Sequence, residues 1–83
     1  MTSKEWSELK SGDKVGGFIG EDFDGIVFRV VRRVGKNNLQ LLIIKNDNRE
    51  YDNSTYKVGR SVIACTPNAY KQSGSSRYSI KIK

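Results

Sequence analysis

The stretch GIVFRVVRRVGKNNLQLLII, residues Gly25–Ile44, decides the fold. Two apolar-rich runs, Ile26–Val34 and Leu39–Ile44, flank the turn Gly35–Asn38, and this arrangement predicts a β-hairpin. The first run alternates with a period of two, as a strand buried on one face does. Arg32 breaks the alternation, so we expect either a strand end where its side chain reaches water or a bulge that carries it outside.

Further strands are expected on both sides of the hairpin. Lys14–Ile19 precedes it, and Gly16-Gly17 within that run indicates a bulge, a sharp bend or the close approach of another backbone. Arg60–Thr66 follows it and is largely apolar on both faces, which predicts a strand covered on two sides and a packed, buried Cys65. The last predicted strand, Arg77–Lys83, alternates between a core face of Tyr78, Ile80 and Ile82 and an outer face of Arg77, Ser79, Lys81 and Lys83.

Two short helices and a connector complete the expected elements. Ser3 is predicted to cap a helix through about Lys10, with Trp6 as a plug over one end of the core. An exposed Trp6 that stacks on a nucleic-acid base is the alternative. Pro67 is expected to begin a one-turn helix, and Gln72–Ser76 a flexible Ser/Gly connector.

Together these elements predict one mostly β domain, residues 1–83, folded as a five-stranded antiparallel barrel. Its opening, Trp6–Val15 with the form W-x-x-L-K-x-G-D-K-V, and the order of elements that follows resemble the SH3-like small barrels, which include KOW, Tudor and Sm-type modules. The resemblance implies a binding module. An OB-like five-stranded barrel fits the same order of strands and remains the alternative.

The distribution of charge points to a polyanionic partner. The chain has a net charge of +6 and an isoelectric point near 9.7. Residues 1–28 carry three lysines against six carboxylates, whereas residues 29–83 carry twelve Lys or Arg against three carboxylates. Such asymmetry is typical of proteins that bind nucleic acid, although a charge of this size also serves solubility.

Several classes of function are not expected. The chain has no histidine and one cysteine, so the commonest general base is missing and a zinc site cannot be built. Asp22 and Asp24 are formal acid–base groups on a loop without a predicted pocket, so we expect no enzyme, no metal and no cofactor. No apolar run approaches a membrane span, and the N-terminus does not resemble a secretory signal, so a cytoplasmic protein is expected.

The first functional hypothesis is a non-catalytic module that binds DNA or RNA through a basic barrel face. Lys and Arg side chains would neutralise phosphates, and tyrosines would add stacking on unpaired bases. Half-buried packing in the barrel is the alternative role for each tyrosine. The predicted phosphate contacts are Arg29, Arg33, Lys36, Lys45, Arg60, Arg77, Lys81 and Lys83, and the stacking candidates are Tyr51, Tyr56 and Tyr70.

The second hypothesis is a small interaction protein, an inhibitor or adaptor that binds an acidic surface of a protein partner. It rests on the segment Gly20–Gly25, read as a solvated acidic loop with an aromatic residue at its centre. Strand edges also permit a small homo-oligomer in place of a monomer. The candidate protein contacts in this loop are Glu21, Asp22, Phe23 and Asp24.

Overall fold

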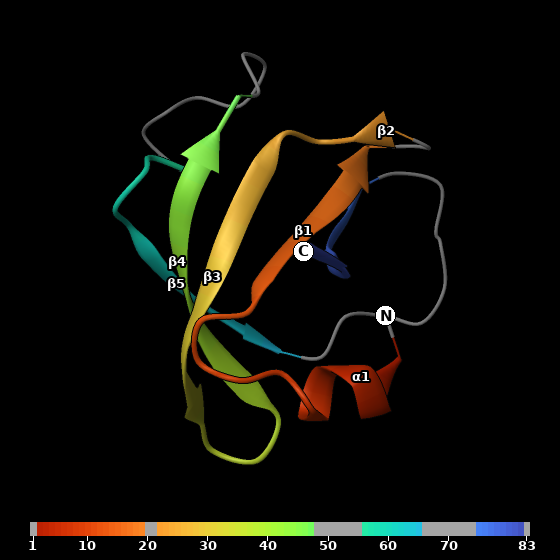
Figure 1. The fold of residues 1–83 in the computed structure, drawn as a ribbon, viewed down its shortest axis with the longest axis vertical. Coiled ribbons are helices and arrows are strands. Elements are labelled where there is room, and N and C mark those ends of the chain that lie inside the picture. The colour runs from red at the N-terminus through yellow and green to blue at the C-terminus, as the bar shows by residue number, and fades with distance from the viewer. Residues whose placement is uncertain (1, 20–21, 48–55, 66–74, 83) are drawn as a thin grey trace.

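The computed structural model describes residues 2–19, 22–47, 56–65 and 75–82 (Figure 1). Within these ranges the protein has one short helix and six antiparallel strands in a single curled sheet. This confirms the predicted mostly β, barrel-like fold with an N-terminal helix. The strand beyond the expected five is β2 (Asp22–Phe23), a two-residue strand in the segment predicted to be a loop. The predicted helix at Pro67 lies outside the described residues.

The hairpin predicted from the sequence is present and extends further than expected. β3 (Ile26–Val34) and β4 (Asn38–Asn46) pair along their lengths, and Asn38, expected in the turn, belongs to β4 opposite Val34. Three residues therefore connect the strands. The first of them, Gly35, has φ of +66°, a conformation that L side chains rarely adopt and that glycine adopts freely.

A bulge in β3 accounts for the arginine that breaks the sequence alternation. The pairing register with β4 shifts between Val30 and Arg32, so one extra residue is inserted into β3. Side chains after such an insertion change face. Val30 remains in the core while Arg32 is exposed, which confirms the bulge.

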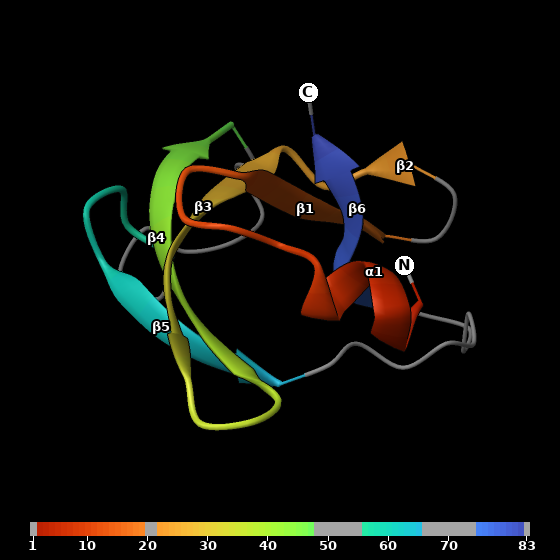
Figure 2. The same ribbon diagram turned by 60° about the horizontal axis from the view of Figure 1, so that its bottom comes forward.

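β1 (Lys14–Ile19) has its predicted bounds and joins the two halves of the sheet. It pairs with β2 and β3 on one edge and with β6 (Ser75–Ile82) on the other, while β5 (Ser61–Cys65) pairs with β4. Figures 1 and 2 show how this order curls the sheet around its core. β6 begins inside the predicted Gln72–Ser76 connector, so the last two residues of that segment are strand.

The core lies inside the curl and is almost entirely apolar. Its residues come from α1 (Ser3–Ser7), the turn after it and four strands, and each is at most 6% exposed. Burial on this scale is the main source of stability for so small a domain. The buried core consists of Trp6, Leu9, Val15, Ile26, Phe28, Val30, Leu39, Leu41, Ile43 and Ala64.

The helix begins one residue earlier than predicted. The Thr2 hydroxyl accepts a hydrogen bond from the Glu5 N–H, and the Glu5 carboxylate accepts one from the Thr2 N–H, which together form a capping box. Thr2 therefore takes the place of Ser3 as the cap, and α1 ends at Ser7, short of Lys10. These bonds lower the pKa of the Glu5 carboxyl, with the Thr2 backbone N–H as the largest cause.

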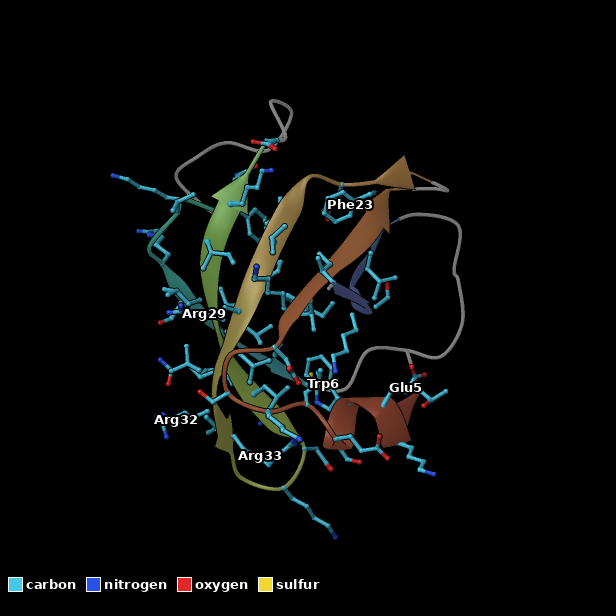
Figure 3. All side chains as sticks on the ribbon, viewed as in Figure 1. Glu5, Trp6, Phe23, Arg29, Arg32 and Arg33 are labelled. Carbon is cyan, nitrogen blue, oxygen red and sulfur yellow. The ribbon has the colours of Figure 1, made fainter. Side chains whose placement is uncertain are left out.

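Trp6 closes one end of the curled sheet, as predicted. Its side chain is 1% exposed, and its Nε1 donates to the carbonyl oxygen of Asn37 at 3.0 Å, in the turn between β3 and β4 (Figure 3). Its ring also contacts Tyr78, with centroids 6.5 Å apart. The alternative of an exposed, base-stacking Trp6 is wrong, because no face of the indole is open to solvent.

The closing strand keeps Tyr78 on the core side as predicted, but the residues after Ser79 face the opposite way from the prediction. Antiparallel partners share one face of a sheet, and buried Val15 pairs with Lys81 while Gly16 pairs with Ile80. Lys81 is therefore on the core side, at an end where its head group reaches water. Ile80 and Ile82 lie on the outer face and are half-buried.

A bulge in β6 causes this reversal. The register with β1 shifts between Gly16 and Phe18, and Tyr78, which stands in the bulge, has φ of +59°. This backbone conformation is unfavourable for a bulky residue. The Tyr78 ring stays on the core side and meets the Phe28 ring edge-on, with ring centroids 4.9 Å apart. Ser79, which was predicted to face outward, is buried.

β5 is covered on one side only, which corrects the prediction of a strand buried on both faces. Val62 and Ala64 are partners of core residues on β4 and face inward. The alternate residues face outward: Ile63 is 58% exposed, and Cys65 is an exposed free thiol rather than a packed one. Apolar character alone could not distinguish the two faces, because both parities of the strand carry apolar residues.

Candidate functional site

Two cations stand side by side on the outer face of the sheet, the face opposite buried Val15 and Phe28. Lys14 on β1 and Arg29 on β3 are direct antiparallel partners, and both are exposed. Such partners have Cβ atoms about 4.5–5.5 Å apart, and like charges in this position are destabilising. A bound anion would convert that repulsion into attraction.

Arg32 extends the same face along β3 (Figure 3). The bulge brings it opposite Gln40, whose Oε1 accepts a hydrogen bond from Arg32 Nε at 2.7 Å. This bond restrains the guanidinium while leaving its other nitrogens to water. We call Lys14, Arg29 and Arg32 the outer basic row. Within the described ranges, none of the three forms an ion pair.

Arg33, predicted to contact phosphate, is instead engaged with the helix. Its Nη2 donates to the carbonyl oxygens of Trp6, Ser7 and Leu9 at 3.2, 3.1 and 3.3 Å. These oxygens lie at the C-terminal end of α1, where a positive charge is favourable. The side chain thereby fastens the helix to the β3–β4 hairpin.

The other predicted phosphate contacts are dispersed. Lys45 Nζ lies 3.3 Å from an Asp47 carboxylate oxygen, and Lys81 Nζ lies 3.7 Å from one of Asp13. Lys36 is exposed in the hairpin turn, and Arg60 is exposed before β5. The side chain of Arg77 and the whole of Lys83 lie outside the described residues. Of the predicted set, the outer basic row therefore contains only Arg29.

Tyr56, the one stacking candidate within the described residues, packs against the core. Tyr56 is half-buried, packs against the core cluster and meets the Phe28 ring edge-on, with centroids 6.5 Å apart. This supports the packing alternative over base stacking for this residue. Tyr51 and Tyr70 lie outside the described residues.

An aromatic side chain that the sequence placed in the acidic loop lies instead on the outer face. Phe23 is 46% exposed, and a Cβ added to Gly16 would be 2.7 Å from Phe23 Cε2 and 2.9 Å from Ile82 Cδ1. The ring, which is labelled in Figure 3, therefore lies over the space that Gly16 leaves open, beside Ile82. We call Phe23, Ile80 and Ile82 the outer apolar patch.

The prediction of a solvated acidic loop is wrong for its last carboxylate. Asp24 is 4% exposed, and its Oδ1 accepts a hydrogen bond from the Ile26 N–H at 2.9 Å. An aspartate that binds a backbone N–H two residues on stabilises a turn, here the one between β2 and β3. Glu21 and the side chain of Asp22 lie outside the described part of the chain.

Sequence reasoning missed two members of the outer basic row. Lys14 immediately precedes Val15, and strict alternation places it on the face opposite the core, so its exposure was readable from the sequence. Its pairing with Arg29 was not, because register depends on how the strands meet. Arg32 required knowledge of where the bulge lies.

The described residues offer little support for other chemistry. They contain no cluster of three or more His, Cys, Asp or Glu able to hold a metal ion. None of the helical structure in these ranges is long and apolar enough to cross a membrane. A depression of about 230 Å³ beside α1 is lined by Glu5, Glu8, Leu9 and Lys81, whose charges are mixed.

Comparisons of the chain with protein-family models, with curated proteins and with solved structures find no match.

Proposed function

We propose that this protein is a non-catalytic module that binds nucleic acid through the outer basic row. The observation that carries the proposal is the direct pairing of Lys14 with Arg29, two exposed cations on adjacent strands, with no ion pair to either within the described residues. Repulsion between them destabilises the free protein and would be relieved by a phosphate.

The size of the row sets the expected salt dependence. Three phosphate contacts give a slope of log K against log salt of about −2.1 to −2.7. Raising salt from about 50 to 200 mM should then weaken binding about 20- to 40-fold. Arg29 and Arg32 can also form forked hydrogen bonds to phosphate, which a lysine cannot.

The test is a binding titration by fluorescence anisotropy with labelled single-stranded and duplex DNA and RNA. The double variant Lys14→Ala, Arg29→Ala should bind more weakly and reduce the magnitude of the slope by about 1.4–1.8. The matched control, Lys4→Ala with Lys10→Ala, removes the same charge from exposed residues of α1 and the turn after it, and should leave the slope close to that of the wild type. Absence of wild-type binding at low salt, or equal effects of the two double variants, contradicts the proposal.

Two finer assignments accompany this proposal. A barrel of the SH3-like type is supported by the pairing of the last strand, β6, with the first, β1, and by the hairpin between them in sequence. An intracellular, cytoplasmic setting is supported by the single cysteine, which remains an exposed thiol. An acidic protein surface is the competing ligand for the same cations, and polyglutamate is the probe that distinguishes it from nucleic acid.

A further inference from the structure

We infer that the ligand is a single strand, and that Phe23 is the platform on which one unpaired base stacks. The inference rests on the proposed function, since it names the form of nucleic acid that the outer face takes. Its basis is the position of the outer apolar patch, which continues the outer basic row across β1 and β6.

The aromatic ring occupies the space over Gly16, with Ile82 beside it. With no side chain at Gly16, Phe23 Cε2 approaches to 2.7 Å from where a Cβ would be, and Ile82 Cδ1 to 2.9 Å. Pairing of Phe23 with Phe18 ties the backbone of β2 to β1. The ring is thereby held in place, yet 46% of the residue remains exposed. A restrained, exposed aromatic ring loses little conformational freedom when a base covers it.

The ring lies close to the first cation of the row. Lys14 and Gly16 are two residues apart on the same face of β1, a spacing of about 6.6 Å in a strand. Ile82 joins the two sites, because it is the direct partner of Lys14 while its Cδ1 lies over Gly16. A ligand that covers Phe23 therefore has Lys14 and then Arg29 along its path across the sheet.

This combination suits a single strand better than a duplex. In a duplex the bases are stacked on one another and paired, so a ring on a sheet surface cannot stack on one without opening the helix. An unpaired base has a free π-face and stacks on an aromatic side chain without regard to sequence, while cations follow the backbone. An acidic protein segment would fit both sites only if it carried an apolar or aromatic anchor beside its carboxylates, whereas every nucleotide of a single strand supplies a base and a phosphate together.

The experiment compares Phe23 variants on single-stranded and duplex probes. The single-stranded probe is a labelled oligothymidylate of about 12 nucleotides, a length within the roughly 4–16 nucleotides that one single-strand-binding OB fold covers. The duplex probe has the same length. Phe23→Ala should weaken binding of the single strand about 5- to 150-fold, leave duplex binding within about twofold, and leave the salt slope unchanged. Phe23→Leu keeps an apolar side chain over Gly16 and should also weaken single-strand binding, which guards against misfolding of the Ala variant.

The control is Ile63→Ala, which removes an apolar side chain from β5 at a residue that is 58% exposed, and which should not change either affinity. The inference fails if both Phe23 variants bind the single strand as tightly as the wild type. The proposed function still stands in that case, provided that the wild type binds nucleic acid and the double variant Lys14→Ala, Arg29→Ala flattens the salt slope. Equal losses on both probes also overturn the inference. Binding of polyglutamate as tightly as the oligonucleotide at the same salt overturns it in favour of an acidic protein partner, whereas absence of all nucleic-acid binding overturns the proposed function itself.

Discussion

Two arginines of β3, Arg29 and Arg33, should lose different properties on the same substitution. Arg33→Met removes a guanidinium that donates to three carbonyl oxygens at the end of α1, whereas Arg29→Met removes one that has solvent around it. Both variants lose one positive charge and keep a long apolar stem. Any difference between them therefore reports what the two guanidinium groups contact.

The hydrogen bonds of Arg33 set the expected magnitude. Hydrogen bonds to charged groups contribute about 1.5–3 kcal/mol to stability, and the lower value applies here because the side chain is exposed. Arg33→Met should thus lower the free energy of unfolding by about 1.5 kcal/mol and the Tm by about 6–12 °C for a domain of this size. Arg29→Met should stay within about 0.5 kcal/mol of the wild type, since its loss also removes repulsion with Lys14.

Urea unfolding followed by tryptophan fluorescence measures the first effect, because Trp6 is the only tryptophan and is buried. Anisotropy titrations with labelled nucleic acid measure the second: Arg29→Met should reduce the magnitude of the salt slope by about 0.7–0.9, and Arg33→Met should leave it unchanged. Equal stability of the two variants would refute the structural role of Arg33, and equal salt slopes would refute the functional role of Arg29.

Three further predictions concern the helix cap, the glycine under Phe23 and the free thiol. Because the folded-state pKa of Glu5 is lowered, the contribution of this carboxylate to stability is present above the unfolded pKa and is lost as pH falls through the folded pKa. The difference in free energy of unfolding between the wild type and Glu5→Ala, measured by urea unfolding from pH 7 to pH 3, should therefore narrow below roughly pH 4. A difference that stays constant would contradict the capping box. Gly16→Ala should lower the free energy of unfolding by about 1–3 kcal/mol, because the new methyl group would meet Phe23, Ile82 and the Ile26 carbonyl oxygen, the last at 3.1 Å. A Tm equal to that of the wild type would show that the Phe23 ring does not lie over Gly16. The Cys65 thiol should react with an aromatic disulfide reagent about as fast in the folded protein as in urea. A much slower reaction in the folded protein would support the buried thiol that the sequence predicted.

The strands could be predicted where one feature of the sequence determined them. Period-two alternation identified β3 with its observed bounds, and the glycine pair in β1 predicted an irregularity that the register confirms. Trp6 was predicted to cover one end of the core because a short helix is not stable alone and a large apolar side chain on it is expected to pack against the core. These features are local, so the sequence carries them directly.

Facing and pairing could not be read in the same way. The residues of β6 alternate regularly, but after the bulge at Tyr78 the other set of alternate residues faces the core. The alternation in the sequence does not indicate that a bulge is present. Ile63 and Cys65 look as apolar as their buried neighbours, so only the pairing with β4 separates inside from outside. Register is set by contacts between distant segments, and a shift of one residue exchanges the two faces.

The candidate site depends on register even more strongly. The sequence indicated a basic segment, residues 29–83, that contains Arg29, but the partner of Arg29 on β1 is Lys14, from residues 1–28, where acidic residues are in excess. Arg33 matched Arg29 in charge and parity, yet the bulge between them sends one guanidinium to the helix carbonyls and leaves the other in solvent. Charge counting predicted a class of partner, and strand pairing was needed to select the residues for the proposal.

The most direct test of the central claim is a nuclear magnetic resonance titration of the isotopically labelled protein with a short oligonucleotide. If the outer basic row is the binding surface, the largest amide shift changes at low salt will fall on Lys14, Arg29 and Arg32 and on their neighbours across β1 and β3. Changes concentrated instead around Lys45 and Lys81, with the outer face of β1 and β3 unperturbed, would contradict the account.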